Sequence, residues 1–131
     1  MVDLIMNAKI LVMDNDTSNA DVIRLILENE DFQVKTVIKP QLFQKIADNF
    51  NPDLILMDIM LDGDDGRLLC NDFKIRSSTA HIPVMLITAM LETEAKDLAC
   101  QADMIMYKPF EYARLVQNVR MLLQRNMDTG E

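Results

Sequence analysis

Five short runs of apolar residues alternate along the chain with five stretches in which apolar residues recur at the spacing of a helix. Four of the runs are almost continuously apolar, which is typical of parallel strands that are buried on both faces. The alternation therefore predicts an α/β fold, in which helices cover both faces of a five-stranded parallel sheet. The predicted strands cover residues 9–14, 32–37, 53–58, 83–88 and 103–107.

The limits of the predicted helices come from polar residues and prolines at their ends. The first helix is expected over residues 17–30, with Thr17 or Ser18 as its N-cap. Pro40 opens the second helix, because the missing N–H of proline costs nothing in a first turn. A hydrated turn rich in Asp and Gly is expected at residues 61–66, followed by a helix that carries Leu68, Leu69 and Phe73, a short acidic helix at 92–101, a last helix at about 111–125 and a tail at 127–131.

Length and charge narrow the class of protein. The chain has 131 residues, which is about one domain's worth, and we expect a single domain over residues 1–131 with a core at about 8–125. The formal net charge is −8, and this excess of acid argues against a nucleic-acid partner, because phosphate contacts need lysine and arginine. The net charge says little else, because it bears on solubility and association more than on fold.

The cysteines and the apolar runs exclude further classes. Cys70 and Cys100 have no CxxC spacing and His81 is the only histidine, so we expect two reduced thiols and no Cys/His metal site. The longest nearly apolar run, residues 82–91, is far below the ~20 residues that span a bilayer. The N-terminal segment MVDLIMNAK lacks the pattern of a signal peptide. A cytoplasmic location without a membrane partner is the expectation.

Polar side chains stand where the predicted strands end. Parallel strands bring their carboxyl ends to one edge of the sheet, where such folds place their sites. Clustered carboxylates there favour a hard divalent cation such as Mg²⁺, a hydroxyl and an ammonium group can neutralise phosphoryl oxygens, and one carboxylate can act as the nucleophile. Together they suggest phosphoryl transfer to an aspartate. The residues concerned are Asp14, Asn15, Asp16, Asp58, Thr88 and Lys108.

Four segments in this order resemble the response-regulator receiver family over nearly the whole chain: KILVMDND, PDLILMDIMLDGDDG, IPVMLITA and DMIMYKPF. The resemblance implies a flavodoxin-like, doubly wound sheet with five helices and the strand order 2-1-3-4-5, of which the receiver CheY is a well-known example. It also implies a regulatory domain of two-component signalling, which catalyses only its own phosphorylation and dephosphorylation.

The resemblance assigns roles to single positions. Asp58 matches the phosphoacceptor, Thr88 the hydroxyl that moves onto the phosphoryl group, and Lys108 the lysine whose peptide bond to Pro109 is usually cis. Asp14 and Asn15 match the acidic pair that binds Mg²⁺, and Met60 matches the residue that lends its backbone carbonyl to the metal. The output face is expected around Ile105 and Tyr107.

Three positions depart from the family pattern. Asn15 replaces an acid that normally touches Mg²⁺. It is expected to be either a weakened ligand, so that metal binding is weak, or a turn-forming residue that has lost ligation. Asp62 stands where the family often has proline, and it could reach the metal directly or through water. Ile105 replaces the aromatic residue that usually reports activation. The expected partners are a sensor histidine kinase or phosphotransfer protein, a downstream protein or a linked output domain, and a second copy in a homodimer.

Two other functions fit some of these residues. The first is a haloacid-dehalogenase-type phosphatase, with Asp14 as nucleophile and Asp16 as general acid, although it leaves Asp58 unexplained and lacks an acidic metal motif after Lys108. The second is a degenerate receiver that binds proteins without phosphorylation, which Asn15 and Ile105 favour. Flavin binding is weaker, because no phosphate loop follows the first strand.

Overall fold

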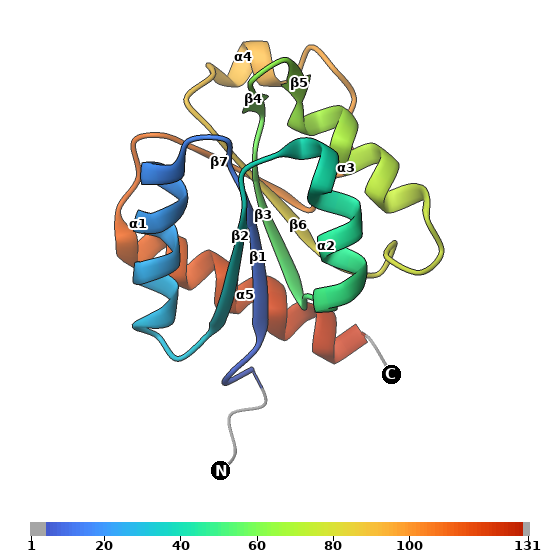
Figure 1. The fold of residues 1–131 in the computed structure, drawn as a ribbon. Helices are drawn as coiled ribbons and strands as arrows, with labels where there is room; N and C mark the ends of the chain where they lie inside the picture. The colour runs from blue at the N-terminus through green and yellow to red at the C-terminus, as the bar shows by residue number, and fades with distance from the viewer. Residues whose placement is uncertain (1–4, 130–131) are drawn as a thin grey trace.

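The structure, a computed structural model, describes residues 5–129, so residues 1–4 and the end of the predicted tail, residues 130–131, lie outside it. Within that range the predicted alternation is confirmed (Figure 1). The strands are β1 (Lys9–Met13), β2 (Gln33–Val37), β3 (Leu54–Asp58), β4 (Met60–Leu61), β5 (Asp64–Asp65), β6 (Val84–Thr88) and β7 (Met104–Tyr107). The helices are α1 (Thr17–Glu28), a 3₁₀ turn η1 (Pro40–Leu42), α2 (Phe43–Phe50), α3 (Gly66–Ile75), α4 (Glu92–Ala95) and α5 (Tyr112–Thr129).

The five long strands form one parallel sheet in the order β2-β1-β3-β6-β7. This is the predicted order 2-1-3-4-5, because β4 and β5 form only a short antiparallel hairpin of their own. The order reverses between β1 and β3, which is where folds of this kind place their ligands.

Alternate residues of the strands point into two separate hydrophobic layers. On one face Ile10, Val12 and Leu56 pack with α1 and α5, and on the other face Leu11 and Met57 pack with α2 and α3. The central strands are buried on both sides, which explains why their sequences are continuously apolar. Among the described residues, no helix is long and apolar enough to cross a membrane.

Three predicted helix limits were wrong. The N-cap of α1 is Asp16, whose Oδ1 accepts the N–H groups of Ser18 and Asn19, and it is neither Thr17 nor Ser18. The last helix runs on to Thr129, through part of the predicted tail. The helix expected over residues 92–101 is a single turn, Glu92–Ala95, because side chains of α3 bind the backbone at its end and beyond it.

Candidate functional site

The polar residues at the strand ends gather at one edge of the sheet. Asp14 follows β1, Asp58 ends β3, Thr88 ends β6 and Lys108 follows β7. In Figure 1 this edge is at the top, close to the β4–β5 hairpin and α4, while both ends of the chain are at the bottom. Residues that are far apart in the sequence are thereby brought to one place.

Asp58 is held between a backbone N–H and an ammonium group. Its Oδ1 accepts the N–H of Met60 at 2.9 Å, and its Oδ2 lies 3.6 Å from Nζ of Lys108. Only 12 % of the Asp58 side chain is exposed, against 27 % for Lys108. The contact is looser than a hydrogen-bonded ion pair of about 2.8 Å, so the lysine neutralises the carboxylate without saturating it.

Asp14 is a second carboxylate at this edge and is almost fully buried. Its Oδ1 accepts the N–H of Asp16 at 2.9 Å. Burial, and after it the negative charge of Asp58, raises the pKa of the Asp14 carboxyl above its ordinary value, although the N–H of Asp16 and the charge of Lys108 act in the opposite direction. A buried acid whose ionisation is opposed by a neighbouring carboxylate favours a cation between the two.

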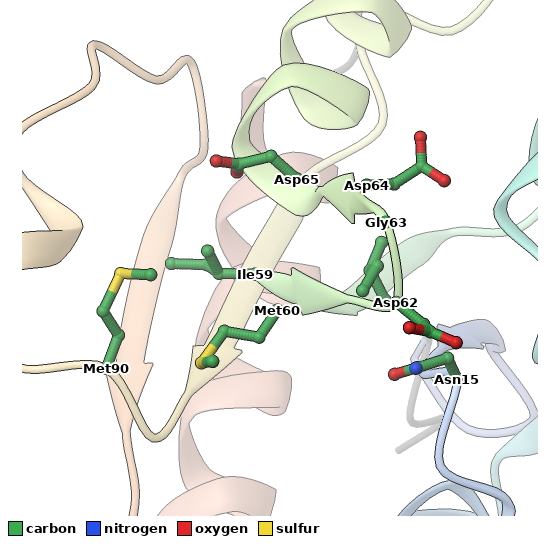
Figure 2. Close-up of a pocket in the computed structure, with 9 residues that line it drawn as sticks. Asn15, Ile59, Met60, Asp62, Gly63, Asp64, Asp65 and Met90 are labelled. Carbon is green, nitrogen blue, oxygen red and sulfur yellow. The ribbon is translucent and has the colours of Figure 1, made fainter.

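Asn15 and Asp62 line the same two pockets at this edge of the sheet. One pocket, of about 450 Å³, lies against the β4–β5 hairpin and Met90, and the other, of about 520 Å³, lies against residues 38–42. Figure 2 shows the Asp62 carboxylate directed toward the Asn15 side chain, whereas Asp64 on the same hairpin points away. Asn15, which stands where the receiver family has an acid, therefore has a carboxylate neighbour on another element.

The oxygen donors at the edge form a mixed set. Among residues 5–129, no group of three or more Asp, Glu, His or Cys side chains gathers as a metal site. The candidate donors at the strand ends are the carboxylates of Asp14 and Asp58, the amide of Asn15 and a backbone carbonyl after Asp58. Magnesium is commonly held by one or two carboxylates and keeps several waters, so this set fits Mg²⁺ and predicts weak binding.

Thr88 joins the ends of β6 and β7. The residue is fully buried, its Oγ1 accepts the N–H of Met90 at 3.0 Å, and its carbonyl accepts the N–H of Lys108 at 2.8 Å. The oxygen of Thr88 is the acceptor in the bond to Met90, so that bond does not use the hydroxyl proton. The predicted cis peptide bond between Lys108 and Pro109 is confirmed.

Ile105 and Tyr107 lie next to this edge on β7. Both are half-buried and pack against the hydrophobic layer of α2 and α3. Each is paired in register with β6, Ile105 with Leu86 and Tyr107 with Thr88. A movement of the Thr88 backbone would therefore act directly on the backbone of Tyr107.

The loop after Asp58 has a structure that the sequence pattern did not predict. The expected hydrated turn at residues 61–66 is a hairpin, and Asp65 is the N-cap of α3, where it also forms an ion pair with Arg67 at 2.7 Å. Gly66 is required because a Cβ there would collide with the carbonyl oxygen of Asp58. The Asp-Gly pair directly before an apolar helical stretch was the available signal for this cap.

Comparison with known proteins finds relatives among bacterial response regulators. The chain is 31% identical over 119 residues to the DNA-binding dual master transcriptional regulator RpaA of Synechocystis sp., which covers 89% of the chain and 49% of RpaA. It is 34% identical over 119 residues to the response regulator PleD of Caulobacter vibrioides, again over 89% of the chain but only 26% of PleD. The chain thus spans about half the length of RpaA and about a quarter of that of PleD.

Solved structures share the fold and the sequence pattern. The signal receiver domain of a signal transduction histidine kinase from Syntrophus aciditrophicus has a TM-score of 0.82 at 28% identity, with 89% of this chain and 90% of that chain covered. A CheY-like receiver domain protein from Methanospirillum hungatei has a TM-score of 0.81 at 26% identity, over 93% and 98%. The family model of the response regulator receiver domain matches residues 10–120. The chain therefore belongs to the response regulator receiver domain family.

Proposed function

We propose that this domain accepts a phosphoryl group on Asp58. The observation that carries the proposal is the pairing of a nearly buried Asp58 carboxylate with the Lys108 ammonium group at 3.6 Å, beside the second buried acid Asp14. An oxygen of Asp58 forms a bond to phosphorus while the bond from phosphorus to the donor's leaving group breaks, and the leaving group takes the electron pair. The product is an aspartyl phosphate.

The chain's own residues act by position and charge. Lys108 neutralises charge on the phosphoryl oxygens, and the N–H of Met60 fixes the orientation of the carboxylate through Oδ1. Thr88 supplies a hydroxyl at the end of the neighbouring strand β6, which can donate its proton to a phosphoryl oxygen. No separate general base is needed, since an ionised carboxylate is already a nucleophile.

A bound Mg²⁺ would add positive charge next to the phosphoryl oxygens. We propose Asp14, Asn15, Asp58 and the Met60 carbonyl as its ligands, with Asp62 as a further ligand, direct or through water. The support is the chemistry of the donors and the position of Asp62 beside Asn15 on the two shared pockets. Because position 15 offers a neutral amide, we expect weak binding and slow phosphorylation that improves at high metal concentration.

The partners follow from the same chemistry. We propose a sensor histidine kinase or a phosphotransfer protein as the donor. The readout would be a protein surface around Ile105 and Tyr107, used by a downstream partner, a linked output domain or a second copy of the chain. The longer relatives support a linked output domain, since the chain matches only part of each.

The direct test is the mass of the protein after incubation with acetyl phosphate and Mg²⁺. We expect one added phosphoryl group on the peptide that contains Asp58, and complete loss of the addition in Asp58→Asn. Asp64→Asn removes an exposed acid from the same loop and should still be phosphorylated. A modified peptide that maps to Asp14 would favour the phosphatase mechanism and contradict the proposal.

A receiver that works without phosphorylation is the second candidate, and Asn15 is the observation that favours it. The same experiment separates the two. If neither acetyl phosphate nor beryllofluoride alters the protein at saturating Mg²⁺, while partner binding persists in Asp58→Asn, the phosphorylation-independent function holds.

A further inference from the structure

Cys70 and Cys100 lie close to each other on the face of the sheet that α2 and α3 cover. Cys70 is fully buried on α3, in the hydrophobic layer shared with α2. Cys100 lies between α4 and β7, is half-buried and packs against the same layer. Only these two cysteines occur in the chain, so the pair includes both of its thiols.

Asn71, the residue after Cys70, holds the backbone on both sides of Cys100. Its Nδ2 donates to the carbonyl of Ala99 at 3.0 Å, and its Oδ1 accepts the N–H of Gln101 at 2.8 Å. A single side chain of α3 therefore fixes the position of Cys100 along the helix, next to Cys70.

The sulfur of Cys100 is turned toward α3. Its Sγ lies 3.9 Å from the carbonyl of Arg67, one turn before Cys70, and it accepts the N–H of Ala102 at 3.4 Å. On the other side of the pair, Nη1 of Arg67 donates to the carbonyls of Glu94 and Ala95, each at 3.2 Å. Hydrogen bonds from α3 thus hold the chain both before and after Cys100.

The two thiols are close enough for Cys100 to affect the ionisation of Cys70. Burial, followed by the negative charge of a Cys100 thiolate, raises the pKa of the Cys70 thiol to about 12. The buried thiol is therefore a slow nucleophile, whereas the half-buried Cys100 can be reached by small molecules.

We propose that Cys70 and Cys100 form a dithiol–disulfide pair that small disulfides of the glutathione type can oxidise. The Cys100 thiolate attacks one sulfur of the oxidant, the S–S bond of the oxidant breaks, and one small thiolate leaves. Cys70 then gives up its proton to solvent and attacks the Cys100 sulfur, and the second small thiolate leaves. Two protein thiols are oxidised by two electrons while one small disulfide is reduced to two thiols.

The disulfide would fasten the segment after α4 to α3. That segment leads into β7, which carries Ile105 and Tyr107, so oxidation would restrain the surface proposed as the readout. This consequence rests on the proposed function, whereas the formation of the bond does not.

The test treats the reduced protein with oxidised glutathione under native conditions and then alkylates all free thiols in denaturant. We expect a monomer that takes up no alkylating groups and has lost the mass of two hydrogen atoms. Cys70→Ala should stop at one glutathione on Cys100, and Cys100→Ala should remain unmodified when folded. Circular dichroism checks that both variants are folded.

Wild-type protein alone can overturn the proposal. Two alkylated thiols, a glutathione adduct that never resolves, or a disulfide only between two chains would each contradict it. In the oxidised monomer we expect slower amide exchange at residues 96–102 and a rise in Tm of about 5 to 10 °C. Beryllofluoride-induced NMR shifts on β7 should shrink on oxidation; if the bond forms and they do not, the readout role of this surface fails and the redox pair stands.

Discussion

The two edges of the sheet use the same kinds of side chain for different purposes. At the edge where the strands begin, Asp103 forms an ion pair with Lys74 at 2.8 Å and accepts the N–H of Val84, while Lys74 also donates to the carbonyl of Ile82 at 2.7 Å. At the edge where the strands end, Asp58 and Lys108 are 3.6 Å apart and Asp14 is kept from ionising easily. Saturated groups hold strands together, and unsaturated groups remain available to a ligand.

A second acid repeats the arrangement at the first edge. Asp53, just before β3, accepts the N–H of Lys9 at 2.8 Å, and its own N–H donates to the carbonyl of Lys9 at 2.7 Å. The acids before β3 and β7 thus extend the backbone ladder, whereas the acids after β1 and β3 crowd each other. For these four acids, the position relative to the strand separates the two arrangements, because the residue type is the same.

The largest stability effect is expected at the saturated edge. Lys74→Met leaves the Asp103 carboxylate without its close partner, although Arg125 lies 3.9 Å away, and removes the bond to Ile82. We expect the free energy of unfolding in urea to fall by about 1 to 2 kcal/mol, because Asp103 is partly exposed and water can replace some of the lost interaction. Phosphorylation of the folded variant should keep its wild-type rate.

Lys96→Met is the matched control, because Lys96 pairs with Glu92 at 3.4 Å on an exposed surface. Such pairs contribute about 0 to 1 kcal/mol, so the urea midpoint of Lys96→Met should hardly differ from that of the wild type. Equal losses in the two lysine variants would break the distinction between the edges.

The continuous apolar runs and the polar residues directly after them were sufficient to predict the parallel sheet and the residues that meet at its end, whereas the strand order followed from the resemblance to the receiver family. The sequence was insufficient for the β4–β5 hairpin, since strands of two residues have no periodicity. The length of α4 was also out of reach, because Arg67 and Asn71 bind the backbone after its first turn from another helix. Such tertiary hydrogen bonds leave no local pattern.

The largest effect on metal binding is expected from Asn15→Asp. A carboxylate in place of a neutral amide should tighten Mg²⁺ by about 10 to 100-fold and speed phosphorylation. Asn19→Asp adds the same charge on the exposed first turn of α1 and is the control. Titration of Mg²⁺ followed by NMR gives the dissociation constant of each of the three proteins. Equal affinities for wild type and Asn15→Asp would mean that position 15 does not face the metal.

Asp14→Asn should stabilise the protein, whereas most substitutions of buried residues lower the free energy of unfolding. The amide oxygen can keep the bond from the N–H of Asp16, while the buried charge that Asp58 opposes is removed. We therefore expect the free energy of unfolding without metal to rise by about 1 kcal/mol, together with loss of Mg²⁺ binding. Asp72→Asn, which removes an exposed charge from α3, should change neither quantity. A destabilised Asp14→Asn protein would place Asp14 with the structural acids of the other edge.

The smallest effect is expected from Asp62→Asn. Asp62 is exposed, so its charge acts through water-like surroundings, and a unit charge about 6 Å from a cation in water is worth about 0.7 kcal/mol. Mg²⁺ binding should weaken by about threefold in Asp62→Asn and by less in Asp64→Asn, whose carboxylate points away from Asn15 in Figure 2. If Asp62 stands in for the acid missing at position 15, its removal should matter less once Asn15→Asp is present. Equal weakening by both hairpin variants, independent of position 15, would assign the effect to net charge and leave the site with Asp14 and Asp58 as its only carboxylates.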